Sequence, residues 1–345
     1  MVDPEGAGAP FAGSGPYYVA EFVRGSRVVL ARNPFYRGQR AHHLDGFVFQ
    51  IEDAGGTVVS KVESGELDLA LGFTNPNIDH LVAKYGINKS QYFTLPSPVM
   101  FYLHMNTSRP LFRHNVKLRQ AVSFAIDRTA MAEAIGPGGF APTDDYLPTG
   151  LPGSVDGHLY PLRPNLAKAR ALASGHTKSG TAVLYTCVDT GTAGSCLAHG
   201  QIIKADLKLI GIDVQIEQFP NSVEIIKEGT RGEPFDIGLE RYDVPWVDPY
   251  QYVNLLLDGR TIRATGNTNL SYFNSAHYNK LIDRAGSLSG RARFLAYGRL
   301  ALDIAKNAAP IAAFANRNSK FFVSGRVGCV TAGAHNVDLA GLCLK

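Results

Sequence analysis

The chain has 345 residues, of which 45% are hydrophobic and 19% charged, and its formal net charge is +4. This length exceeds that of most single domains, so we expect two lobes, and the composition is typical of a globular protein with a sizeable core. The basic residues are dispersed, which argues against a nucleic-acid-binding surface, and no apolar run reaches the roughly 20 residues of a membrane-spanning helix. The first residues also lack the basic start and apolar core of a secretory signal, which leaves a cytoplasmic protein or a fragment.

The first third of the chain alternates between strands and helices. We predict strands at 17–22, 27–32 and 47–51, a helix at 58–64, a strand at 67–71 and a buried strand at 99–106. Gly25-Ser26 supplies the turn between the first two strands. This alternation is typical of an α/β layer.

The same alternation continues toward the carboxyl end. We predict helices at 116–134, 165–173, 198–209, 278–286 and 291–308, and strands at 182–186, 213–219, 235–239, 311–315 and 320–323. Asn165 is a plausible cap of the second helix. Residues 142–164 are rich in Pro and Gly and should be largely irregular.

The four cysteines fall into two local pairs, Cys187 with Cys196 and Cys329 with Cys343. Four cysteines permit three connectivities, and the sequence alone does not choose among them. Two short-loop disulfides in an oxidising compartment are favoured over buried free thiols. Neither spacing is that of a zinc site, so we expect no metal and no cofactor.

Catalytic motifs are weak throughout the chain. The residues around Ser195 lack the second Gly of a nucleophile elbow, and no Gly-Lys-Ser/Thr follows the Gly-rich start to form a phosphate loop. His104 and the other histidines have no metalloprotease spacing. The carboxylates Asp243 and Asp248 could act as an acid/base pair, so a hydrolase stays open as an alternative, although such pairs are common in loops. We expect no enzyme.

Residues 240–250, hereafter the aromatic segment, are unusual. They contain two Tyr, the single Trp of the chain and three acidic residues, directly after a predicted strand. Ligands often bind at the carboxyl ends of strands in α/β sheets, and aromatic side chains combine apolar area with a polar handle. The segment is therefore a candidate binding site, against the alternative of an ordinary loop whose Trp fills a core.

Several segments, in this order, resemble the family 5 extracellular solute-binding proteins, which serve dipeptide, oligopeptide and nickel ABC importers. Gly13 to Tyr17 is similar to the family's G-T-G-P-Y, and Arg32 to Gly38 is similar to R-N-P-x-Y-W-G. The other matching segments are 102–107, 116–128, 147–153, 205–211 and 235–237 leading to 247–249. The resemblance extends from about Gly13 to Lys345.

The resemblance implies an α/β, two-lobed type II periplasmic-binding-protein fold that closes on a ligand held between lobes. We expect a partial lobe I at 1–105, lobe II at 106–315 and a return to lobe I at 316–345. The family carries a long portion before its G-T-G-P-Y segment, whereas a dozen residues precede Gly13 here. We therefore interpret the chain as the carboxy-terminal two-thirds of a receptor with an incomplete lobe I, and we expect poor solubility from the core left open.

The function implied is that of the non-catalytic substrate-binding component of an ABC importer for oligopeptides or peptide-like solutes. Its partners would be the solute and a membrane permease, with no nucleic acid. The full-length protein would be extracytoplasmic, in the periplasm or at the cell surface, secreted or anchored as a lipoprotein. The alternative is the solute-sensing domain of a cytoplasmic transcriptional regulator.

For the ligand-binding site, we predict Tyr242, Asp243 and Trp246, with His104 and Asn106 near the crossover as further candidates. Peptide-binding members hold the ligand ammonium with an Asp three residues before the acidic residue of the D-P or E-P pair. Counting back from Asp248 gives Pro245. This difference leaves a modified peptide, a sugar or an apolar solute open as the ligand.

Overall fold

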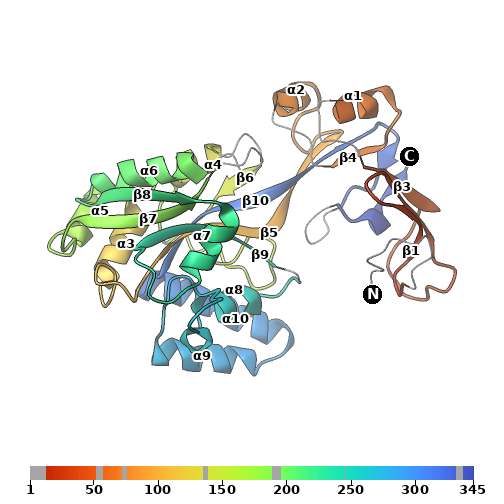
Figure 1. Cartoon of the computed structure of the whole chain (residues 1–345). Helices are drawn as coiled ribbons and strands as arrows, with labels where there is room; N and C mark the ends of the chain where they lie inside the picture. Colours follow the sequence, from red (N-terminus) through yellow and green to blue (C-terminus); the bar gives the residue numbers. More distant parts are fainter. Residues whose placement is uncertain are drawn as a thin grey trace. The chain divides into compact units, whose positions relative to one another are not determined.

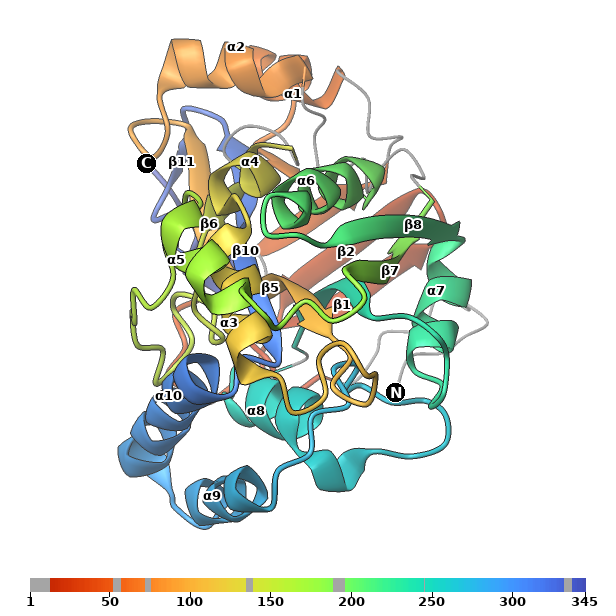
Figure 2. The same cartoon turned by 90° about the vertical axis from the view of Figure 1, so that its left-hand side faces the viewer.

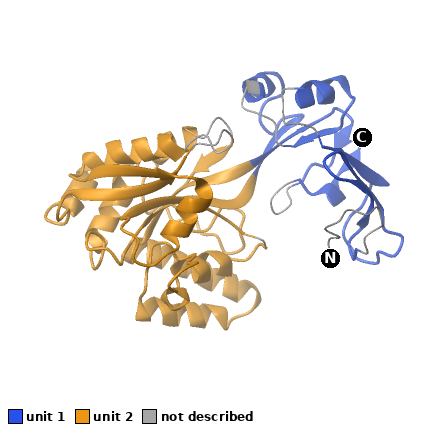
Figure 3. Ribbon diagram, in the orientation of Figure 1, with its two compact units in different colours: residues 1–95, 319–345 blue, residues 96–318 orange. Residues whose placement is uncertain are grey.

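The computed structural model describes residues 13–51, 57–71, 76–134, 139–188, 196–244, 246–331 and 337–345. The chain forms two compact units (Figure 3): unit 1 comprises residues 1–95 and 319–345, and unit 2 comprises residues 96–318. The lobe borders expected from the sequence, at 105/106 and 315/316, differ from these borders and stay a prediction. No described helix is both long and apolar enough to cross a membrane.

Unit 1 contains a small antiparallel sheet and a second, separate core. The sheet has the order β1 (Tyr17–Val23), β2 (Arg27–Arg32), β3 (Gly46–Gln50), with Gly25 in the first turn at a φ of 72° that favours glycine. The second core is formed by α1 (Thr57–Ser64), β4 (Leu69–Leu71) and α2 (Pro76–Tyr85), whose buried residues pack with Phe322. The chain ends in β11 (Val327–Gly328) paired with β12 (Cys343–Leu344).

Two long strands belong to both units. They are β5 (Tyr92–Met105) and β10 (Ile311–Val323), which pass the borders at 95/96 and 318/319 and are neighbours in one sheet (Figure 1). Most of their residues are buried. In β10 the apolar runs 311–315 and 321–323 are separated by the polar residues 316–320.

Unit 2 is a three-layer α/β structure. Its strands follow the order β10, β5, β9 (Ile237–Asp243), β7 (Thr181–Cys187), β8 (Asp213–Phe219), with β6 (Phe140–Pro142) on the other edge of β10. On one face the core includes α3 (Val116–Ala125), α4 (Arg128–Glu133), α5 (Leu166–Ala173) and α6 (Cys196–Lys208). On the other face lie α8 (Tyr250–Leu257), α9 (Ala276–Gly286) and α10 (Gly290–Asn307), as Figures 1 and 2 show. A short helix, α7 (Asn221–Glu228), follows β8 and packs on β7 and β8.

Several predicted elements differ from those observed. The helix predicted at 116–134 is two helices, because Ile126 is extended at φ −71° and ψ 135° and Asp127 caps α4 by accepting the backbone N–H of Ala130. The two closing strands are the single strand β10, and the strand predicted at 99–106 begins at Tyr92. The strand predicted at 235–239 continues to Asp243, so part of the aromatic segment is regular β-structure. The helices α2, α7 and α8 were not predicted.

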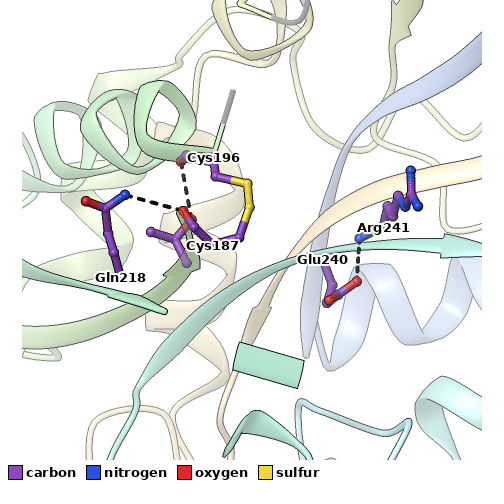
Figure 4. Close-up of a disulfide and its surroundings, with 6 residues drawn as sticks. Cys187, Cys196, Gln218, Glu240 and Arg241 are labelled. Carbon is purple, nitrogen blue, oxygen red and sulfur yellow. Dashed lines mark hydrogen bonds between the residues drawn. A yellow bond between two sulfur atoms is a disulfide. The ribbon is translucent and has the colours of Figure 1, made fainter. Parts of the chain in front are cut away.

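The four cysteines form two disulfides. Cys187, at the end of β7, is bonded to Cys196, at the start of α6, with a Cα–Cα distance of 5.5 Å (Figure 4). Gln218 of β8 donates its side-chain N–H to the Cys187 carbonyl at 3.3 Å. In unit 1, Cys329 is bonded to Cys343 at 5.4 Å. The structure thus selects the local pairing among the three connectivities, and Ser195, inside the first loop, lies outside the described residues.

Candidate functional site

The end of β9 carries the first part of the aromatic segment. β9 pairs with β5 in antiparallel register, with Asp243 opposite Val99, Glu240 opposite Tyr102 and Gly238 opposite His104. Because side chains alternate along a strand, Gly238, Glu240 and Tyr242 lie on one face of the sheet. Glu240 and Arg241 consequently point to opposite sides of β9 (Figure 4).

The aromatic residues of this segment present a surface to solvent. Tyr242 is half-buried and packs edge-to-face on Tyr252 at a centroid distance of 5.4 Å, and this burial raises its pKa. Asp243 is exposed at the end of the strand, and Trp246 is 56% exposed. The alternative that this Trp fills a core is therefore wrong. An exposed indole, a half-buried phenol and an exposed carboxylate within five residues of the chain are groups suited to an amphipathic solute.

Both carboxylate oxygens of Asp248 accept hydrogen bonds from neighbouring residues. Its Oδ2 accepts a hydrogen bond from Arg293 Nη1 at 2.5 Å, and its Oδ1 accepts the backbone N–H of Tyr250 at 2.8 Å, at the start of α8. Asp248 thus links the start of α8 to Arg293 of α10. Because both of its oxygens are used in this way, the structure gives no support to an acid/base pair of Asp248 with Asp243. Pro245, which stands at the ammonium-binding position, lies outside the described residues.

His104 and Asn106 are placed differently from our expectation. Asn106 is 1% exposed; its Nδ2 donates to the Phe235 carbonyl at 3.1 Å and its Oδ1 accepts the backbone N–H of Ser108 at 3.1 Å. His104 is completely buried and bonded to Glu228. Both side chains connect β5 to its neighbours inside unit 2, so we keep Tyr242, Asp243 and Trp246 as the proposed ligand contacts.

Sequence reasoning missed a cluster of acidic side chains around His104. This quartet consists of three buried residues, His104 on β5 and Glu224 and Glu228 on α7, and the partly buried Glu240 on β9. The His104 Nε2 to Glu228 Oε2 distance of 3.0 Å fits an ion pair, but neither side chain is exposed. Burial raises the pKa of Glu228 well above its usual range and lowers that of His104 to about 4. We therefore assign a neutral pair in which the Glu228 carboxyl donates to Nε2.

Gly238 allows this pair to approach β9. A Cβ atom there would lie 2.1 Å from Glu228 Oε1 and 2.3 Å from the His104 ring. We expect Gly238→Ala to lower the free energy of unfolding by on the order of 1 kcal/mol or more, because the quartet must move. Urea unfolding checks this against Gly325→Ala, where no described atom lies within 4 Å of the added methyl. Equal midpoints for the two variants would contradict the packing argument.

A separate hollow of about 500 Å³ lies in unit 2 beside β6 and is lined by Thr143, Asp144, Asp145 and Asn316 among others. Burial raises the pKa of Asp145 to about 6. The aromatic segment does not line this hollow. Across the described ranges, no three His, Cys, Asp or Glu side chains are placed to hold a metal ion.

Comparison with known proteins agrees with the resemblance described above. The family described as "Bacterial extracellular solute-binding proteins, family 5 Middle" matches residues 2–263. The chain is 24% identical over 275 residues to the probable D,D-dipeptide-binding periplasmic protein DdpA of Escherichia coli, covering 79% of this chain and 51% of that protein. It is 24% identical over 311 residues to heme-binding protein A of Haemophilus influenzae, covering 89% and 55%. The chain thus spans about half the length of these two relatives.

The fold has close counterparts among solved structures. HbpA2 of Haemophilus parasuis superposes with a TM-score of 0.81 at 22% identity, covering 96% of this chain and 64% of that one. This likeness confirms the α/β, type II periplasmic-binding-protein fold expected from the sequence. With the family match over residues 2–263, it gives the assignment: the chain belongs to the bacterial extracellular solute-binding proteins of family 5.

Proposed function

We propose that this chain is part of the non-catalytic substrate-binding component of an ABC importer for oligopeptides or peptide-like solutes. The observation that carries the proposal is the 56% exposed side chain of Trp246, three residues after the end of β9, in a chain of a solute-binding family. Small-molecule sites are lined mainly by hydrophobic and aromatic side chains, with a few polar groups that fix the orientation of the ligand. Asp243 would meet a cationic or hydroxyl group of the solute.

The rest of the receptor follows from the same proposal. Unit 1 would be part of lobe I, unit 2 would be lobe II, and a membrane permease would be the partner. The protein would act outside the cytoplasm, as a secreted or lipid-anchored protein, where the two disulfides are stable. Relatives are named for D,D-dipeptides, di- and tripeptides, glutathione and heme, so peptide-like solutes are the first class to test.

A titration of the protein with a panel of di- to tetrapeptides, glutathione, heme and sugars tests the proposal. Trp246, the single Trp of the chain, is the fluorescence reporter. We expect a saturable change in emission with a peptide-like solute and recovery of that solute chemically unchanged. Hydrolysed solute would favour the hydrolase. Reduced Cys187, Cys196, Cys329 and Cys343 in protein from its native source would favour the cytoplasmic regulator.

A further inference from the structure

The helix α7 packs with its polar side inward. Glu224 and Glu228 are 2% and 0% exposed, while Val223, Ile225 and Ile226 are 40%, 42% and 67% exposed. Surface helices normally turn the apolar stripe to the core and the charged side to water. Ile226 lies two residues from each glutamate, on the opposite side of the helix. If the two glutamates were ionised, an orientation of α7 with the glutamates in water and Ile226 toward the core would be more favourable than the observed one. The observed orientation therefore fits neutral glutamates.

The contacts of the two glutamates point to the neutral form. Within the described part of the chain, the Oε1 atoms of Glu224 and Glu228 are buried without a hydrogen-bond partner. A buried carboxylate in this condition costs several kcal/mol, whereas a protonated carboxyl needs fewer partners. Lys227, the cation on the same helix, is turned away and pairs with Glu233 at 2.8 Å.

We propose that α7 is a pH-operated latch, which holds β9 and the aromatic segment while Glu224 and Glu228 are protonated and releases them when both carboxyls ionise. The mechanical link is the contact of Glu228 and His104 with Gly238, four residues before Tyr242 on the same strand. The consequence for solute capture rests on the proposed function, but the release of α7 does not.

Other titratable groups surround the latch on every element that packs against it. They are His104 and Tyr102 on β5, Glu240 on β9, Tyr185 on β7, Glu217 on β8, Lys227 on α7, and Arg231, Glu233 and Tyr272 in the loops. The carboxyl groups outnumber the cations in this set, so ionisation of one glutamate opposes ionisation of the next.

The direction of the pH effect follows from the shifts in pKa. Burial, followed by the neighbouring Glu228 and Glu240, raises the pKa of Glu224 to about 9. Since this folded value lies above the unfolded value of about 4.3, the contribution of Glu224 to docking is fully present below pH ~4.3 and is lost as pH rises toward 9. His104 acts at the acidic end of the pH range. Because burial lowers its pKa to about 4, the stability that neutral His104 gives to docking is lost as pH falls from 6.5 toward 4.

Hydrogen exchange of α7 between pH 6 and 10, corrected for the intrinsic rate of each pH, tests the latch in the whole protein. We compare the wild type with the double variant Glu224→Gln, Glu228→Gln, which keeps the shape of neutral carboxyls and cannot ionise. We expect the protection of α7 against exchange to fall about tenfold or more by pH 10 in the wild type and to persist in the variant. Helix α10 serves as an internal control and should stay protected in both proteins. Such a fall is a change of at least 1.4 kcal/mol in the opening free energy.

Two outcomes would overturn the latch: α7 stays protected at pH 10 in the wild type, or both proteins lose protection at the same pH. If the double variant does not fold at pH 6, Glu224→Gln alone must shift the wild-type transition to higher pH. Emission of Trp246 reports the coupling and should change in the same pH range as α7 exchange. Constant emission while α7 opens would disprove the coupling. Absence of solute binding at every pH would bear on the proposed function instead.

Discussion

Replacing Arg128 with Met is expected to destabilise unit 2 by about 3 kcal/mol or more. The Arg128 side chain is completely buried. Its Nε donates to the Ala313 carbonyl at 2.8 Å, and its Nη1 donates to the carbonyls of Ser123 at 2.8 Å and Pro161 at 3.0 Å. Met fills a similar volume but removes the Arg128 donor from each of these three carbonyls, and a buried carbonyl left unpaired costs about 1–3 kcal/mol.

Urea unfolding at pH 7 measures this effect. The matched control is Arg113→Met, because Arg113 is exposed and the same substitution there should change the free energy of unfolding by less than about 0.5 kcal/mol. Arg128 connects the end of α3, the strand β10 and the loop before α5, so its loss should lower the midpoint without abolishing the β1–β3 sheet of unit 1. Equal midpoints for the two variants would show that Arg128 does not hold these segments together.

Replacing Trp246 with Ala is expected to weaken solute binding by about 2 kcal/mol, which is roughly a 30-fold rise in Kd. The indole is 56% exposed, so its truncation removes contact area for a ligand without opening a cavity in the core. Calorimetry is the suitable measurement, because this variant loses its fluorescence reporter. The control is Leu209→Ala, at a 45% exposed site beyond the end of α6, where affinity should not change. Unchanged affinity in Trp246→Ala would place the solute site elsewhere.

Much of the fold could be predicted from the sequence, because local patterns determined it. Alternating residues in 213–219 and the cap at Asn165 identified β8 and α5 closely. The break between α3 and α4 was missed because Ile126 continues the apolar periodicity and only its extended backbone ends the helix. The helix α7 was missed for a different reason: its inward residues are glutamates, so its apolar pattern lies on the wrong side.

The binding role of the candidate site stays a prediction, and the structure shows only the surroundings of its residues. Composition identified Tyr242 and Trp246, and the structure places one half-buried and the other in solvent. Composition alone could not reveal that His104 and Asn106 are buried. Their burial depends on the pairing of β5 with β9, whose residues are more than 120 positions apart in the sequence. The link between His104 and Glu228 has no sequence signal, because a His in a strand and a Glu in a helix are each ordinary alone.

The central claim is that the protein captures a solute without changing it. Incubating the 345-residue chain with a pool of short peptides, followed by removal of unbound material and mass spectrometry of what the protein releases on denaturation, tests this directly. The account predicts that one class of peptide-like solute is retained at a stoichiometry near one and released chemically intact. Release of cleaved products, or no retention together with an unchanged Trp246 emission, would contradict it.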